Sequence, residues 1–187
     1  CIRDRLDIGC GMGKALILMA ETYPYSHFTG LDISEEAITK ARASAKEKGL
    51  TNITLKVQDL TEFDMEAPVA QYDFITAFDA IHDQARPDRV LVGIYKALKR
   101  NGTFLMQDIA ASSDVEKNID NPIAPFMYSI STMHCMTVSL AQGGMGLGTM
   151  WGKEKALEML SETGFNEVNV KNLAHDFQNN YYIAEKN

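Results

Sequence analysis

Three glycines at alternate positions, Gly9, Gly11 and Gly13, separate a short apolar strand from an apolar helix. We expect the strand over residues 5–8 and the helix over residues 14–22. Glycine lets the backbone turn sharply and lets a ligand approach the main chain closely. In open α/β sheets, ligands bind beyond the carboxyl ends of the strands, near the point where the strand order reverses. The loop therefore predicts an α/β fold with a ligand site at this turn.

The rest of the chain continues to alternate between strand-like and helix-like patterns, which predicts βαβ crossovers and a mainly parallel sheet. The further strands are expected over 27–33, 53–58, 74–78, 103–107, 168–173 and 181–185. The further helices are expected over 34–48, 153–163 and from Pro87 to the Asn101-Gly102 pair. No helix separates the last two strands, so they should pair as an antiparallel hairpin. We interpret residues 1–187 as one domain, in which residues 110–150 form an irregular inserted segment over the substrate.

Composition excludes several classes of protein. The chain of 187 residues has a formal net charge of -7 and no cluster of lysine and arginine, which argues against a nucleic-acid partner. No apolar run is long enough to span a bilayer, and no secretory leader is visible. Cys1, Cys10 and Cys135 are far apart in the sequence, so neither a disulfide framework nor a structural zinc site is indicated. A cytoplasmic protein with reduced thiols is the simplest interpretation.

The acid at the end of the second strand, Asp32, indicates what kind of ligand the loop would hold. A carboxylate there can accept hydrogen bonds from both hydroxyls of a ribose. A dinucleotide site expects G-x-G-x-x-G, whereas here the third glycine comes one residue early and Lys14 takes the expected place. An enzyme that uses NAD or a nucleotide sugar remains an alternative, which this spacing disfavours.

The pattern Asp7-x-Gly9-x-Gly11-x-Gly13 with Asp32 resembles the S-adenosylmethionine site of class I methyltransferases. The resemblance extends through Tyr72-Asp73-Phe74-Ile75 and Leu98-Lys99-Arg100-Asn101-Gly102-Thr103 over essentially the whole chain. It implies a Rossmann-like, mainly parallel seven-stranded sheet with an antiparallel last strand and helices on both faces. It also implies S-adenosylmethionine as cofactor and S-adenosylhomocysteine as product. The residues that it places at the cofactor are Asp7, Gly9, Cys10, Gly11, Gly13, Asp32, Ile33, Asp59, Leu60, Phe78 and Asp79.

The resemblance gives these residues different roles. Gly9 and Gly11 would face the amino-acid part of the cofactor, and Asp32 would hold the ribose. Ile33 would pack on adenine, and Asp59 would contact the adenine amino group. Asp7 would mainly order the loop, and Phe78 or Asp79 would lie near the methionine moiety.

The stretch Phe78-Asp79-Ala80-Ile81-His82-Asp83-Gln84 is similar to a segment of small-molecule O-methyltransferases in which a histidine deprotonates a hydroxyl group. His82 is therefore the candidate base, with a structural or substrate-positioning role as the alternative. Gln84-Ala85 replaces the Trp-Ser of that family pattern. Asp79 and Asp108 follow two neighbouring strands, where magnesium-dependent relatives carry carboxylates. Because Ile109 replaces the asparagine of those relatives, we expect no metal ion.

The inserted segment supplies the candidate acceptor residues Met127, Met133, His134, Met136 and Trp151. Flexible thioethers suit an adaptable apolar pocket, although the spacing of Met133 and Met136 also fits a helix packed on the core. We expect a small, apolar or aromatic acceptor, with oxygen favoured as the methylated atom because of His82. A catalytically inactive cofactor-binding or dimerisation module on the same fold is the alternative.

The inserted segment, together with His175-Asp176 and the stretch Asn179-Asn180-Tyr181-Tyr182, resembles one subgroup of uncharacterised class I methyltransferases. In that subgroup a winged-helix-like domain precedes the methyltransferase domain and helps to dimerise it. The abrupt start at Cys1 would fit the absence of such a region, and a longer form of the protein would then be a homodimer.

Overall fold

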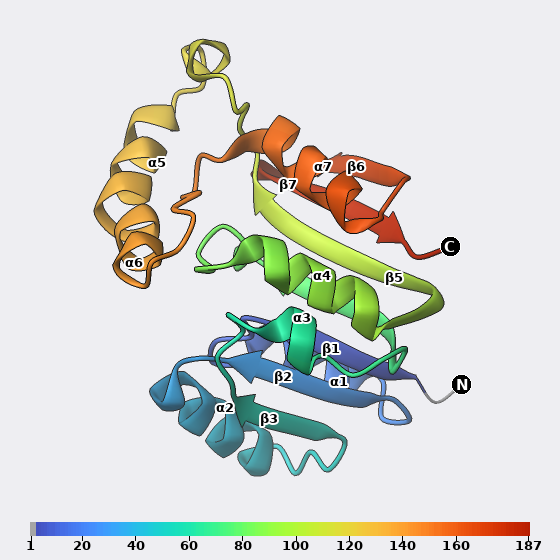
Figure 1. Ribbon diagram of the computed structural model, residues 1–187. Helices are drawn as coiled ribbons and strands as arrows, with labels where there is room; N and C mark the ends of the chain where they lie inside the picture. Colours follow the sequence, from blue (N-terminus) through green and yellow to red (C-terminus); the bar gives the residue numbers. More distant parts are fainter. Residues whose placement is uncertain (1–2) are drawn as a thin grey trace.

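The computed structural model describes residues 3–187, so Cys1 lies outside the described residues. These residues form a seven-stranded sheet with helices on both faces (Figure 1). The strands are β1 (Asp4–Ile8), β2 (His27–Asp32), β3 (Ile53–Val57), β4 (Tyr72–Phe78), β5 (Leu98–Ile109), β6 (Val168–Leu173) and β7 (Asp176–Glu185). The helices are α1 (Lys14–Thr22), α2 (Glu35–Glu47), α3 (Phe63–Glu66), α4 (Pro87–Ala97), α5 (Ala124–Ile130), α6 (Met136–Ala141) and α7 (Gly152–Thr163).

The strand order is β3-β2-β1-β4-β5-β7-β6. The five strands from β3 to β5 are parallel to their neighbours, and β7 runs antiparallel to both β5 and β6. The predicted Rossmann-like sheet and its antiparallel hairpin are confirmed. The strand order reverses between β1 and β4, so the carboxyl end of β1, where the glycine loop begins, lies at the switch point of the sheet.

Each face of the sheet has its own hydrophobic core. Helices α3, α4 and α7 cover one face, where Phe104 and Tyr182 are among the largest buried side chains. Helices α1 and α2 cover the other face around Phe28. Local signals fix these helices: Ser34 caps α2 by accepting the N–H of Ala37 at 3.2 Å.

Several predictions of secondary structure were wrong. Strand β5 runs from Leu98 to Ile109 rather than over 103–107, β7 begins at Asp176 rather than at residue 181, and helix α3 was not predicted. Helix α4 ends at Ala97 rather than at the Asn101-Gly102 pair, because Leu98 is already fully buried and pairs with Tyr72 of β4. The inserted segment is also more regular than expected. It contains a 3₁₀ helix (Val115–Asn118) and a continuous helix over residues 124–141, made of α5, a π-helical turn (Ser131–Cys135) and α6. We call residues 124–141 the cover helix.

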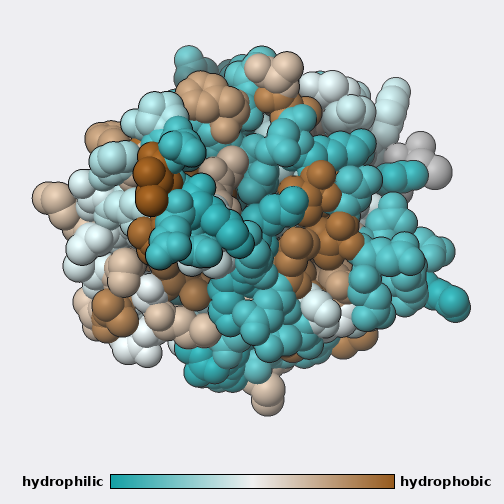
Figure 2. Space-filling view, turned by 90° about the horizontal axis from the view of Figure 1, so that it is seen from above, coloured by the Kyte–Doolittle hydropathy of each residue, from teal (hydrophilic) through white to brown (hydrophobic). Residues whose placement is uncertain are grey.

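The cover helix stands beside the carboxyl ends of the parallel strands, at the left of Figure 1. On the face seen in Figure 2, hydrophobic patches are separated by a mostly hydrophilic surface. Within residues 3–187, no helix combines the length and the apolar content that crossing a membrane requires.

Candidate functional site

The glycine loop is fixed between the ends of β2 and β4. The N–H groups of Gly9 and Cys10 both donate to the carbonyl oxygen of Leu31, at 2.9 and 3.0 Å. Gly9 has a φ of +67°, and a Cβ atom there would lie 2.5 Å from the Cβ of Ala80, beyond β4. Only glycine therefore allows the loop to lie this close to the segment that follows β4.

Asp32 holds the other side of the same loop. One carboxylate oxygen accepts the N–H of Gly11 at 2.7 Å, and the other accepts the N–H of Ser34 at 2.8 Å. The carboxylate is thus fixed by the backbone at both oxygens while its free lone pairs remain available to a ligand.

Asp7 lies beneath the loop and is 2 % exposed. It accepts a hydrogen bond from the Thr76 hydroxyl at 2.7 Å. Burial raises the pKa of Asp7 to about 7, against the opposing effect of that hydrogen bond. The hydrogen-bond donor to its carboxylate belongs to β4, so its role in ordering the loop stays a prediction.

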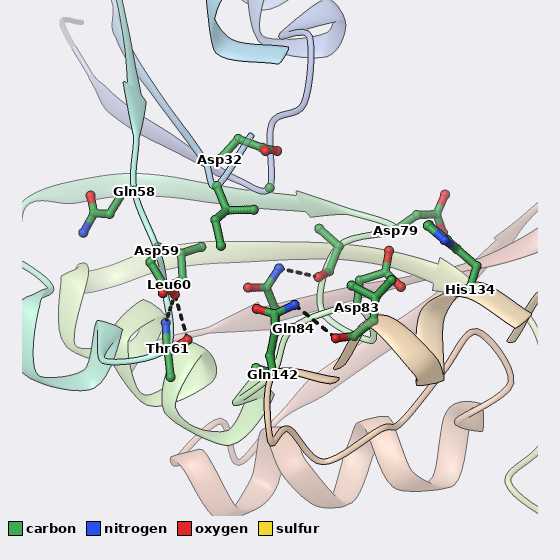
Figure 3. Close-up of a pocket in the computed structure, with 15 residues that line it drawn as sticks. Asp32, Gln58, Asp59, Leu60, Thr61, Asp79, Asp83, Gln84, His134 and Gln142 are labelled. Carbon is green, nitrogen blue, oxygen red and sulfur yellow. Dashed lines mark hydrogen bonds between the residues drawn. The ribbon is translucent and has the colours of Figure 1, made fainter. Parts of the chain in front are cut away.

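A cleft of about 260 Å³ opens at the carboxyl ends of the strands. Figure 3 shows Asp32, Asp59 and Thr61 on one side of it, with Asp83 and His134 on the other. The residues that line the cleft are Gly9, Asp32, Ile33, Gln58, Asp59, Leu60, Thr61, Asp79, Ala80, Asp83, Gln84, Ala85, His134, Val138 and Gln142. The cleft thus brings together seven of the predicted site residues: Gly9, Asp32, Ile33, Asp59, Leu60, Asp79 and His134.

The remaining candidates lie elsewhere. Trp151 is buried in the core beneath α7. Met133 is 81 % exposed, whereas Met127 packs against a small cluster around Ala111. The loop behind the cleft contains Cys10, Gly11 and Gly13 and lies next to Asp7. The lining residues do not include Phe78, His82 or Met136.

The lining residues missed by sequence reasoning come from three places. The segment after β4 supplies Ala80, Asp83, Gln84 and Ala85. Gln58 and Thr61 flank Asp59, and the Thr61 N–H and hydroxyl both donate to Asp59 Oδ1, at 2.9 and 2.7 Å. These two hydrogen bonds lower the pKa of Asp59. The other missed residues, Val138 and Gln142, belong to the end of the cover helix, where no local motif marks a ligand site.

A buried serine attaches the cover helix to the cleft. Ser139 donates to the carbonyl oxygen of Gln84 at 3.0 Å and accepts the N–H of Gly146 at 3.1 Å. The N–H of Met145 donates to the carbonyl oxygen of Ala85 at 2.9 Å. The helix is therefore held against the segment that follows β4.

His82 is buried behind Asp83, with 3 % of its surface exposed. Its Nδ1 lies 2.8 Å from Oδ1 of Asp108, which is fully buried, and its Nε2 lies 3.4 Å from Oδ1 of Asp83. Burial alone would lower the pKa of His82, but hydrogen bonds with Asp108 and Cys135 and the charges of both aspartates raise it to about 11. Asp108 as the partner of His82 was not foreseen, because it depends on the register of β5 against β4.

A family model described as "Methyltransferase domain" matches residues 4–174. The chain belongs to this methyltransferase-domain family. The fold and the family together make it a class I methyltransferase domain whose cofactor is S-adenosylmethionine. The expected cofactor is thereby confirmed.

One curated relative is similar in sequence, and two solved structures share the fold. An uncharacterised protein of Rickettsia prowazekii, RP028, is 27% identical over 132 residues, which are 69% of this chain and 52% of that protein. An O-methyltransferase family protein from Burkholderia thailandensis superposes with a TM-score of 0.75 at 14% identity, covering 98% of this chain and 51% of that one. Phosphoethanolamine N-methyltransferase 2 of Haemonchus contortus superposes with a TM-score of 0.74 at 17% identity, covering 99% and 49%. The chain spans about half the length of each of these three proteins.

Proposed function

We propose that this domain transfers a methyl group from S-adenosylmethionine to a hydroxyl group of a small, apolar or aromatic molecule. One observation carries the proposal. A single cleft is lined by Gly9 of the glycine loop and Asp32 at the end of β2, and also by His134 and Val138 of the cover helix. A cofactor and an acceptor held in one covered cleft would meet in a fixed orientation. Such positioning can supply several kcal/mol of the barrier reduction in a displacement reaction.

The cofactor end of the cleft suits the adenosine moiety. The two oxygens of Asp32 each have lone-pair capacity left for the ribose hydroxyls. Ile33 is 59 % exposed beside it and offers an apolar surface to the adenine ring. The carboxylate of Asp59 is fixed by Thr61, and it would accept a hydrogen bond from the adenine amino group, as the family pattern implies.

The acceptor would bind at the other end, between Asp79, Asp83 and His134. A hydroxyl group loses its proton when it is methylated, so this end must take up a proton. The proposed base is His82, whose Nδ1 is engaged by Asp108 and whose Nε2 points to Asp83 at the cleft wall. This role requires the neutral form of the imidazole, which the raised pKa of about 11 makes a minor form near pH 7, so turnover by this route should rise with pH. Asp83 would connect the imidazole to the acceptor.

Methylation of a small amine is a second candidate, favoured by the charge of the cleft. Asp32, Asp59, Asp79 and Asp83 line it, and no lysine or arginine is among its described lining residues. A cationic acceptor would therefore be attracted, although an amine must lose its proton before it can attack the methyl group.

The proposal is tested by calorimetric titration of S-adenosylmethionine, followed by assays of S-adenosylhomocysteine formation with panels of phenols, alcohols and amines and with bulk tRNA. Turnover restricted to hydroxyl acceptors supports it. Turnover only with amines establishes the second candidate, and turnover only with tRNA refutes both. Cofactor binding without turnover on any acceptor supports the inactive module.

His82→Ala should then lower kcat by about 10²–10⁴-fold and leave the cofactor Kd nearly unchanged. The matched control is His27→Ala, because His27 is exposed at the amino end of β2, opposite Asp32. Equal kcat values for the two variants would exclude His82 as the base.

A further inference from the structure

Three side chains of types that can bind a metal ion meet beside the cleft. His82 and Asp83 belong to the segment between β4 and α4, and Cys135 ends the π-helical turn of the cover helix. One potential ligand atom from each lies within 4.8 Å of the other two. His82 and Cys135 are buried, and the side chain of Asp83 is 39% exposed, on the wall of the cleft.

The spacing of these atoms fits a small tetrahedral metal site. Zinc binds nitrogen, oxygen and thiolate ligands at about 2.0–2.3 Å, which places neighbouring ligand atoms roughly 3.3–3.8 Å apart. Nε2 of His82 lies 3.4 Å from Oδ1 of Asp83. That carboxylate oxygen is buried and has no hydrogen-bond partner among residues 3–187. A bound ion would replace its ion-pair contact with Nε2 and the proton on that nitrogen.

The groups behind the cluster support the same interpretation. Asp108 engages Nδ1 of His82 at 2.8 Å and leaves Nε2 directed at the cluster, which is the carboxylate–histidine arrangement common behind bound metal ions. Oγ1 of Thr149 lies 2.9 Å from Sγ of Cys135, where its hydroxyl can donate to a thiolate. Two of the three ligands are therefore oriented by buried polar partners.

We propose that His82 Nε2, a carboxylate oxygen of Asp83 and Cys135 Sγ form a binding site for one divalent transition-metal ion, with zinc the best match to this set of ligands. Three protein ligands leave the fourth position of a tetrahedral ion open. Because Asp83 lines the cleft, a hydroxyl group of the acceptor could take that position. This last role rests on the proposed function. With the ion on Nε2, His82 would position the ion and would not itself be the base, and the ion would act as a Lewis acid that favours loss of the acceptor proton to solvent.

The site differs from the one that the sequence analysis considered and rejected. That analysis weighed Asp79 and Asp108 as ligands. In the structure, Asp108 contacts His82 instead. Asp79 accepts a hydrogen bond from the side-chain amide of Gln107 at 2.8 Å. Cys135 could not be linked to His82 from the sequence, because only the packing of the cover helix brings them together.

The test measures metal binding directly, without cofactor or acceptor. Protein stripped with a chelator is titrated with Zn²⁺ against a chromophoric competitor, and separately with Co²⁺ while its absorption spectrum is recorded. The expected result is one ion per chain, with a thiolate-to-cobalt charge-transfer band in the near ultraviolet. Asp108→Asn should weaken binding by about 10–100-fold.

Cys135→Ser should remove the charge-transfer band, and Asp83→Asn should weaken zinc binding while keeping the band. The matched control is His134→Ala, because His134 precedes Cys135 but faces the cleft (Figure 3), and its zinc affinity should equal that of the parent protein. Urea unfolding and cofactor titration show whether each variant is folded.

The absence of stoichiometric binding to the parent protein would overturn the proposal. So would a charge-transfer band that survives in folded Cys135→Ser. Failure of methyl transfer with every acceptor would refute the proposed function but leave this result standing, because the metal titration contains neither reactant.

Discussion

Gly9→Ala and Gly11→Ala form a matched pair that isolates the close contact between the glycine loop and the segment after β4. Both glycines have a positive φ, +67° and +53°. An added Cβ would lie 2.5 Å from the Cβ of Ala80 at Gly9, but would have no atom within 4 Å at Gly11. Both variants therefore carry the same backbone penalty, and only one also carries a steric clash.

The expected magnitudes follow from these two terms. A left-handed backbone costs a non-glycine residue about 1–2 kcal/mol. A smaller gain of about 0.4–1 kcal/mol from the stiffer unfolded chain offsets part of it. Gly11→Ala should thus lower the free energy of unfolding by about 1 kcal/mol. Overpacking adds about 1–3 kcal/mol, so Gly9→Ala should lose about 2–4 kcal/mol in total.

The assay is urea unfolding of each variant without cofactor, with the slope m required to stay constant. At this chain length each kcal/mol should also shift Tm by about 2–4 °C. If Gly9→Ala proves no less stable than Gly11→Ala, the contact with Ala80 does not constrain the loop, and our reasoning on the position of the loop is wrong.

Two further predictions concern the acids around the loop. Asp32→Ala should weaken S-adenosylmethionine binding at least about tenfold in a calorimetric titration, since hydrogen bonds to charged groups contribute about 1.5–3 kcal/mol each; an unchanged Kd would remove Asp32 from the cofactor site. Because burial raises the pKa of Asp7 from 3.8 to about 7, the folded state binds a proton that the unfolded state has already released between these values. The contribution of Asp7 to stability is therefore present below pH 4 and is lost as the pH rises toward 7, with a slope of at most about 1.4 kcal/mol per pH unit. Asp7→Asn should remove this slope. In urea unfolding experiments, the free energy of unfolding of the variant should therefore increase relative to that of the parent protein as the pH rises from 4 to 7. Parallel stability curves for the two proteins would contradict the assignment.

The cofactor half of the site was predictable because its signals are local. Gly9 directly follows β1 and Asp32 is the last residue of β2, and the carboxyl ends of neighbouring parallel strands meet at one edge of a sheet. Helix α2 was predicted correctly for the same reason, because both of its end signals are local: Ser34 caps its start and Gly49 follows its end. The sequence therefore predicted the strands and the glycine loop of this half of the fold, and six of the residues that it assigned to the cofactor line one cleft. Their contacts with the cofactor stay a prediction.

The acceptor half was not predictable in the same way, because it depends on packing between distant segments. The spacing of Met133 and Met136 indicated a helix in this segment, but the π-helical turn interrupts the 3.6-residue periodicity, so the extent of the cover helix could not be predicted. His134 and Cys135 are neighbours in sequence, yet one lines the cleft and the other is buried at Thr149. Helix α3 was missed for a simpler reason, since its four residues are too few to show a period.

The position of β7 has a consequence for biosynthesis. This strand is made after β6, yet it lies between β5 and β6 and pairs with both. Until β7 leaves the ribosome, β5 has an open edge and Phe104 lacks the strand that should lie beside it. A nascent chain that stalls before Asp176 would thus expose an unpaired strand, which is a site for aggregation. The sheet can close only when β7 inserts, so the domain should depend on protection of this edge during synthesis.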